Sequence, residues 1–238
     1  MKRTTHSFHS PAMTRESLFS YQCAQCGKCC FHKRIQVGPY EVLRIARNRS
    51  LSTRDCIRTY MEKNGPYLRI AENGACIFLH ESGCLIHPDR PLACRTYPLG
   101  RWVSACGDET FRQLFAHPEC KGLYGQASCV DNFLVEQGAH PYMDAANKCQ
   151  TFFYSLFDMV QKILPEQPEL SRKTRAIVTE EEEVETPFFT QWLDVDTVVK
   201  EYCSLLLCAG PHDNEELFNF YLKGLETLLT EPKGVDYE

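Results

Sequence analysis

The chain has 238 residues, of which 43% are hydrophobic and 24% charged, and this composition excludes wholesale disorder. Its formal net charge of −5 argues against a general nucleic-acid binder. The unusual feature is the presence of 14 cysteines, far more than a packed core requires.

The sequence predicts a protein of the cytoplasm. Residues 1–22 lack the apolar core of a secretory signal, and no stretch approaches the roughly 20 apolar residues that cross a bilayer. Thiols stay reduced in the cytoplasm, which disfavours disulfides. A dense group of cysteines in that compartment is typical of a metal site or a catalytic site.

The elements expected in the first half of the chain are short. Residues 1–20 are expected to form a flexible leader. Helices are predicted over 39–49, where Pro39 suits the first turn, and over 52–63, where a Ser-Thr pair can cap the N-terminus. Alternating or β-branched residues predict short strands at 67–71, 76–79, 101–105 and 110–115.

The second half of the chain is predicted to be helical. Apolar residues recur at spacings of three and four from Tyr142 to Ile163, which predicts a long amphipathic helix. Two further helices are expected at 195–208 and 214–230, and the acidic segment 165–187 is expected to be a linker.

The predicted fold class is therefore α+β and rich in α-helix. A metal-organised cysteine-cluster domain with short strands and loops is followed by a helical C-terminal part. The expected organisation is a leader, the cysteine-cluster domain, a helical extension, an acidic linker and C-terminal helices, at residues 1–20, 20–125, 126–164, 165–187 and 188–238.

The first cysteine cluster is Cys23-Ala-Gln-Cys26-Gly-Lys-Cys29-Cys30. Each Cys-x-x-Cys step lets a tight turn aim two sulfurs at one centre, and Gly27 can adopt the positive φ that such turns often need. Zinc sites commonly take two ligands from each such turn, whereas a cubane iron–sulfur cluster offers separate iron corners to successive thiolates. The three-cysteine run therefore favours an iron–sulfur cluster over zinc.

The second group of cysteines is spread along the chain. Cys76 and Cys84 flank a predicted hairpin, Cys94 follows, and Cys106 and Cys120 lie downstream. Together with the first cluster, four further thiolates would supply either two Cys₄ sites or one metal cluster with supporting thiols. The sequence leaves this division open.

Basic residues surround both groups of cysteines. A Cys₄ zinc site or an oxidised [4Fe–4S] cluster carries about two negative charges, which need local compensation. Lys28, Lys33 and Arg34 flank the first cluster, and Arg90 and Arg95 bracket Cys94. We therefore expect the basic N-terminal region to support an anionic metal site.

The sequence resembles the YkgJ-type cysteine-cluster family, the CxxCxxCC zinc- or iron-chelating domain. The resemblance covers about residues 20–125 and includes the Arg90-Pro91 pair and the segment from Cys94 to Pro98. His87 stands where the family has Tyr, and Ile77 stands where it often has Pro. The resemblance implies a bacterial metal-binding protein and the eight metal ligands Cys23, Cys26, Cys29, Cys30, Cys76, Cys84, Cys94 and Cys120.

The cysteine pattern is more distantly similar to that of the flagellin lysine N-methylases. That similarity implies an iron–sulfur cluster used together with S-adenosylmethionine, but no Gly-rich nucleotide-binding loop accompanies it here. The six remaining cysteines are expected to be mostly core residues, with Cys106 the best candidate for a further ligand.

Three functions stay open from the sequence. The first is a metal-binding protein that chelates an iron–sulfur cluster, with [4Fe–4S] favoured, or zinc, as a redox or metal-dependent module. The second is an S-adenosylmethionine-dependent protein (lysine) methyltransferase-like enzyme, and the third is a structural zinc protein that acts as an interaction module. The expected partner is another protein or a protein substrate, without nucleic acid or membrane. No catalytic residue can be named.

Overall fold

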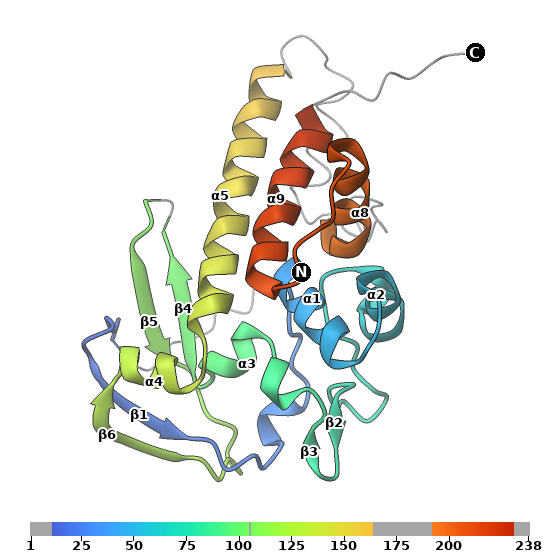
Figure 1. The fold of residues 1–238 in the computed structure, drawn as a ribbon. Helices are drawn as coiled ribbons and strands as arrows, with labels where there is room; N and C mark the ends of the chain where they lie inside the picture. Colours follow the sequence, from blue (N-terminus) through green and yellow to red (C-terminus); the bar gives the residue numbers. More distant parts are fainter. Residues whose placement is uncertain (1–10, 105, 164–191, 231–238) are drawn as a thin grey trace. The chain divides into compact units, whose positions relative to one another are not determined.

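The computed structural model describes residues 11–104, 106–163 and 192–230 (Figure 1). The chain divides into two compact units that interleave along the sequence. The first unit comprises Met1–Gln36 and Leu68–Tyr142, and the second comprises Val37–Tyr67 and Met143–Glu238. None of the helices in the described residues is long and apolar enough to cross a membrane.

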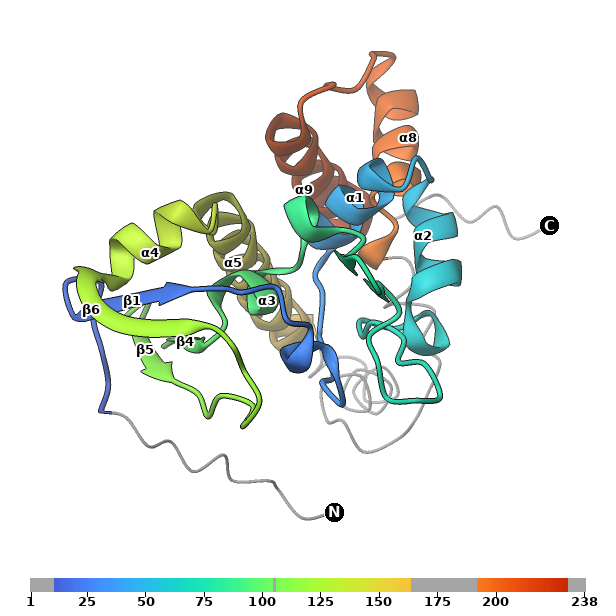
Figure 2. The ribbon, with the colours of Figure 1, turned by 90° about the horizontal axis from the view of Figure 1, so that it is seen from below.

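Antiparallel strand pairs form the frame of the first unit. They are β1 (Leu18–Gln22) with β6 (Leu123–Cys129), β2 (Leu79–His80) with β3 (Gly83–Cys84), and β4 (Leu99–Val103) with β5 (Glu109–Gln113). Tyr21 lies opposite Tyr124 in the first pair. Figures 1 and 2 both show β1 and β6 side by side, although about a hundred residues separate them in the sequence.

Short helices complete the first unit. They are the 3₁₀ turns η1 (Lys28–Cys30) and η3 (His87–Asp89) and the α-helices α3 (Leu92–Thr96) and α4 (Val130–Glu136). Helix α4 follows β6 directly and buries Phe133 against Phe19 of β1, with ring centroids 5.1 Å apart. This contact fixes one face of the β1–β6 pair.

The second unit is helical. It contains α1 (Pro39–Asn48), α2 (Thr53–Tyr60), the 3₁₀ turn η2 (Glu62–Asn64), α5 (His140–Ile163) from Met143 onward, α8 (Val195–Leu206) and α9 (Asn214–Thr230). Leu43 and Tyr221 are buried in its core. Lys148 Nζ of α5 donates a hydrogen bond of 2.8 Å to Asn219 of α9. Apolar faces at helical spacing therefore build this unit.

The structure confirms the predicted α+β class and most of the predicted elements. Helices begin at Pro39, Thr53, Val195 and Asn214, close to the limits expected from the sequence. The long amphipathic helix is α5. The expected hairpin before Cys84 is the β2–β3 pair.

Some expectations differ from the structure. Residues 67–71 form no strand, since Tyr67, Leu68 and Ile70 make only isolated bridges, that of Ile70 to Cys76. The end of the expected leader is paired, because Leu18 begins β1 and Met13 bridges to Phe111. The expected acidic linker at 165–187 lies outside the described residues.

The boundaries of the two compact units also differ from those of the predicted domains. Residues 37–67 pack with the C-terminal helices, because α1 and α2 present apolar faces to α8 and α9. The segment 126–164 begins in β6, which pairs with β1, so its first part belongs to the first unit.

Arg95 of α3 ties several segments of the first unit together. It is 6% exposed, and its guanidinium donates to the carbonyls of Arg90 (2.9 Å), Gln137 (2.8 Å) and Pro88. It also donates to the Tyr142 hydroxyl (2.9 Å) and lies over the Tyr142 ring. One side chain thus joins the turn before α3, the end of α4 and the start of α5.

Replacing Arg95 with lysine is expected to destabilise the first unit. Lysine lacks the planar fork that reaches several acceptors, so part-buried carbonyls and the buried Tyr142 hydroxyl lose their donor and the free energy of unfolding falls by about 3 kcal/mol. Urea denaturation followed by circular dichroism measures this. The control is Arg49→Lys at an exposed position, which should change the free energy by less than about 0.5 kcal/mol. Equal midpoints for the two variants would contradict this role of Arg95.

Candidate metal centre

All eight cysteines predicted as ligands line one cavity of the first unit. The cavity has a volume of about 230 Å³. Its cysteines are Cys23, Cys26, Cys29, Cys30, Cys76, Cys84, Cys94 and Cys120. They arrive from four stretches of chain, so the fold and not the local spacing alone brings them together. This small space, together with the side chains that line it, is called the thiol cavity below.

The first cluster enters the thiol cavity through a sharp turn after β1. Gly27 has φ +70°, and a Cβ there would lie 3.1 Å from Leu79 Cδ1. Glycine therefore suits the position for its backbone and for the close approach of the β2–β3 hairpin. Cys29 and Cys30 follow on the 3₁₀ turn η1, and both line the cavity.

The other thiols are placed by backbone pairing and by α3. The Cys76 peptide N–H donates to the Cys30 carbonyl at 2.8 Å, which holds the two groups of cysteines together. Cys84 lies on β3 opposite Leu79, and Cys94 lies on α3 next to the buried Arg95.

Cys120 precedes β6, and the hydroxyl group of a tyrosine contacts its sulfur. Tyr21 Oη lies 3.5 Å from Cys120 Sγ, and the peptide N–H of Gly122 donates to the same sulfur at 3.4 Å. Tyr97 also lines the thiol cavity, with its ring 6.3 Å from that of Tyr21. No local pattern in the sequence marks these tyrosines, because Tyr21 is 99 residues from Cys120.

The thiols influence one another electrostatically. A hydrogen bond with Cys30 lowers the pKa of Cys29 to about 7, and the same hydrogen bond raises the pKa of Cys30. Peptide N–H groups of Lys121 and Lys28 lower the pKa of Cys26. Thiolate formation, which metal binding needs, is thus already favoured at Cys26 and Cys29.

Burial acts in the opposite direction on the second group. It raises the pKa of Cys76 and of Cys84, and each is raised further by the charge of Cys29. The walls beside them include the buried apolar residues Phe78 and Ile86. A positive charge inside the cavity would therefore be needed to bring these thiols to their ionised form.

The basic side chains that the sequence singled out have different roles. Lys33 and Arg90 line the thiol cavity. Lys28 instead forms an ion pair with Glu119, and Arg95 is engaged by backbone carbonyls. Burial lowers the pKa of Arg90 and Arg95 adds to this, whereas nearby cysteine charges raise it.

The chemistry of the eight thiols suits zinc or iron, but their positions around the cavity wall do not converge on one point. Cysteine sulfurs are soft ligands that suit zinc and iron–sulfur clusters. Over residues 11–104, 106–163 and 192–230, no three or more His, Cys, Asp or Glu side chains are spaced to hold one metal ion. The structure therefore gathers eight donors around one volume without focusing them on a single point.

The six other cysteines do not line the thiol cavity. Cys56 is buried in the second unit, as expected for a core residue, whereas Cys129, Cys149 and Cys203 are only half-buried. Partial burial still raises the pKa of Cys149 to about 12. Cys106, the best candidate for a ninth ligand, is exposed. Cys208 is also exposed, contrary to the expectation of a core position.

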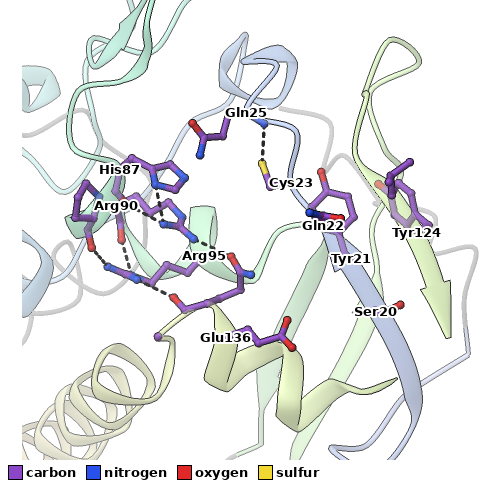
Figure 3. Close-up of a pocket in the computed structure, with 14 residues that line it drawn as sticks. Ser20, Tyr21, Gln22, Cys23, Gln25, His87, Arg90, Arg95, Tyr124 and Glu136 are labelled. Atoms are coloured by element: carbon purple, nitrogen blue, oxygen red, sulfur yellow. Dashed lines mark hydrogen bonds between the residues drawn. The ribbon is translucent and has the colours of Figure 1, made fainter. Parts of the chain in front are cut away.

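A second, open pocket of about 770 Å³ adjoins the thiol cavity (Figure 3). The two spaces share Tyr21, Cys23, Gln25, His87 and Arg90. His87 thus lines both spaces. Figure 3 shows Arg90 and His87 on one side of the open pocket and Tyr21 and Gln22 on the other.

Comparison with known proteins identifies the cysteine-rich part. The model of the CxxCxxCC family, described as "Putative zinc- or iron-chelating domain", matches residues 22–122. The match covers less than half of the chain, and all eight cavity cysteines lie within it. No curated protein and no solved structure matches the chain. The similarity to the flagellin methylases and the location in the cytoplasm stay predictions.

Substituting one cavity cysteine is expected to reduce bound metal. Cys26→Ser removes a thiolate that peptide N–H groups stabilise, so metal per chain should fall to less than about half of the wild-type value. Elemental analysis of purified protein measures it. Cys106→Ser and Cys149→Ser remove thiols outside the cavity and should retain full metal content. Equal metal in Cys26→Ser and the wild type would contradict the assignment.

Proposed function

We propose that the thiol cavity binds an iron–sulfur cluster and that the chain is a metal-dependent or redox module for a partner protein. The observation that carries this proposal is the convergence of eight thiols on one cavity of about 230 Å³. A mononuclear zinc site and a cubane cluster each take four thiolates, so the spread of the thiols around the cavity, and not their number, favours the cluster.

The dispersion of the thiols supports a polynuclear centre. A cubane cluster presents iron corners that are separated in space, and each corner takes one thiolate. Donors that stand around a cavity suit this arrangement better than they suit one central ion. The first cluster, with thiols at Cys23, Cys26 and Cys29, can follow three corners in succession, and the second group supplies the fourth and supporting thiols.

The walls of the cavity suit an anionic, oxygen-sensitive centre. Arg90 and Lys33 supply positive charge, and Phe78, Leu79 and Ile86 supply apolar surface that excludes water. Peptide N–H groups donate to the sulfurs of Cys23 and Cys120. Charge, solvent exclusion and N–H donors are the features by which a protein sets the potential of an iron–sulfur cluster.

The composition of anaerobically purified protein tests the proposal. We expect iron and acid-labile sulfide in equal amounts and a brown protein that absorbs at about 400 nm and bleaches with dithionite. The matched control is the same preparation of a Cys23→Ser/Cys26→Ser/Cys29→Ser variant, which should be colourless.

A colourless wild-type protein that contains one or two zinc ions per chain would contradict the iron–sulfur assignment. The same thiols would then form Cys₄ zinc sites, and their contribution would be to folding stability. Both results keep metal chelation by the CxxCxxCC domain, so the experiment separates the metal from the chelation itself.

A further inference from the structure

The open pocket beside the thiol cavity is polar and accessible. Its volume of about 770 Å³ lies in the range of small-molecule sites. Ser20 and Tyr21 reach it from β1, Tyr124 from β6, and Glu136 from the end of α4 (Figure 3). Strands and a helix, not a single loop, therefore form its walls.

Arg90 is a charged group in the wall whose charge is not balanced by an acid. It makes no ion pair with any carboxylate in the described part of the chain. Other arginines of the same unit do have acidic partners. Arg15 pairs with Glu109 and Asp131, both at 2.7 Å, and Arg101 pairs with Glu109 at 2.5 Å.

The Arg90 guanidinium is held in position by neutral groups. Nη1 donates to the His87 carbonyl at 2.8 Å, and Nη2 donates to Gln137 Oε1 at 2.7 Å. A guanidinium carries five N–H groups, and the described residues give no acceptor for Nε–H. The side chain is thus oriented, and it retains both its charge and donors for a ligand.

We propose that the open pocket binds a small molecule that carries a carboxylate, with Arg90 as the group that receives it. The planar guanidinium fork matches the two oxygens of a carboxylate. The exposed ring of Tyr124, which packs 4.8 Å from the buried ring of Tyr21, offers an apolar surface for the body of the ligand. A ligand here would also lie against Cys23 and hence beside the thiol cavity.

The charge around the pocket favours a monocarboxylate over a phosphate. Arg95 also lines the pocket, but its N–H groups are engaged by the carbonyls of Arg90 and Gln137 and by other buried acceptors. Only the Arg90 fork is then available, and the exposed carboxylate of Glu136 would repel a dianion. The proposal does not depend on which metal the thiol cavity holds.

Calorimetry with a matched pair of probes tests the proposal on the protein as purified. Phenylacetate and phenylacetamide share an aromatic body and differ in the charged group. We expect saturable binding of phenylacetate with one site per chain and binding of phenylacetamide weaker by about tenfold or more. Equal affinities, or no binding of phenylacetate to folded, metal-replete protein, would overturn the proposal.

The Gln137→Glu variant gives an independent arm. It replaces one amide nitrogen by oxygen and places a carboxylate against Arg90 at the position where the amide oxygen now accepts. Because this internal anion neutralises Arg90, phenylacetate should bind about tenfold or more weakly, while metal content stays at the wild-type value. The neighbouring change Glu136→Gln removes a repulsive charge and should leave affinity at least as high.

Two results of these variants would contradict the role given to Arg90. Undiminished phenylacetate binding in Gln137→Glu would show that the carboxylate does not use Arg90. Loss of metal from Gln137→Glu, together with no phenylacetate binding to the wild type, would mean that Arg90 serves the thiol cavity alone.

Discussion

The first unit is organised by the need to hold eight thiols around one small cavity. Ionised cysteines repel each other, and burial penalises each charge further. The pKa of Cys30 and that of Cys84 are both raised, mainly by a hydrogen bond in one case and by burial in the other. A bound cation turns this repulsion into attraction, so metal binding contributes directly to the stability of the fold. The family's description as a zinc- or iron-chelating domain agrees with this constraint.

Arg90 and Arg95, which bracket Cys94, have different roles in the first unit. Arg95 is buried and satisfied by carbonyls and a tyrosine, so it fixes the turn that carries Cys94. Arg90 stands in the wall between the thiol cavity and the open pocket, where its charge faces both. Arg95 therefore positions the backbone near Cys94, whereas Arg90 places a positive charge at the wall of the thiol cavity and of the open pocket.

Spacing and family resemblance predicted the cysteines of the cavity, and helical periodicity predicted α5 and α9. The pairing of β1 with β6 was missed, because its two strands are about a hundred residues apart and β6 lacks clear alternation of burial. The sites of Arg95 and Tyr21 also depend on such distant pairing. Residues 67–71 alternate like a strand, but Tyr67, Leu68 and Ile70 form only isolated bridges and no continuous strand.

X-ray absorption spectroscopy of the as-purified protein, at the edge of the metal it contains, tests the central claim most directly. The account predicts a first coordination shell of sulfur alone at about 2.3 Å, the distance typical of metal–thiolate bonds. An iron–sulfur cluster would add metal–metal scattering to that shell. A first shell dominated by nitrogen or oxygen would show that the metal is held elsewhere, and it would contradict the assignment of the eight cysteines to a metal centre.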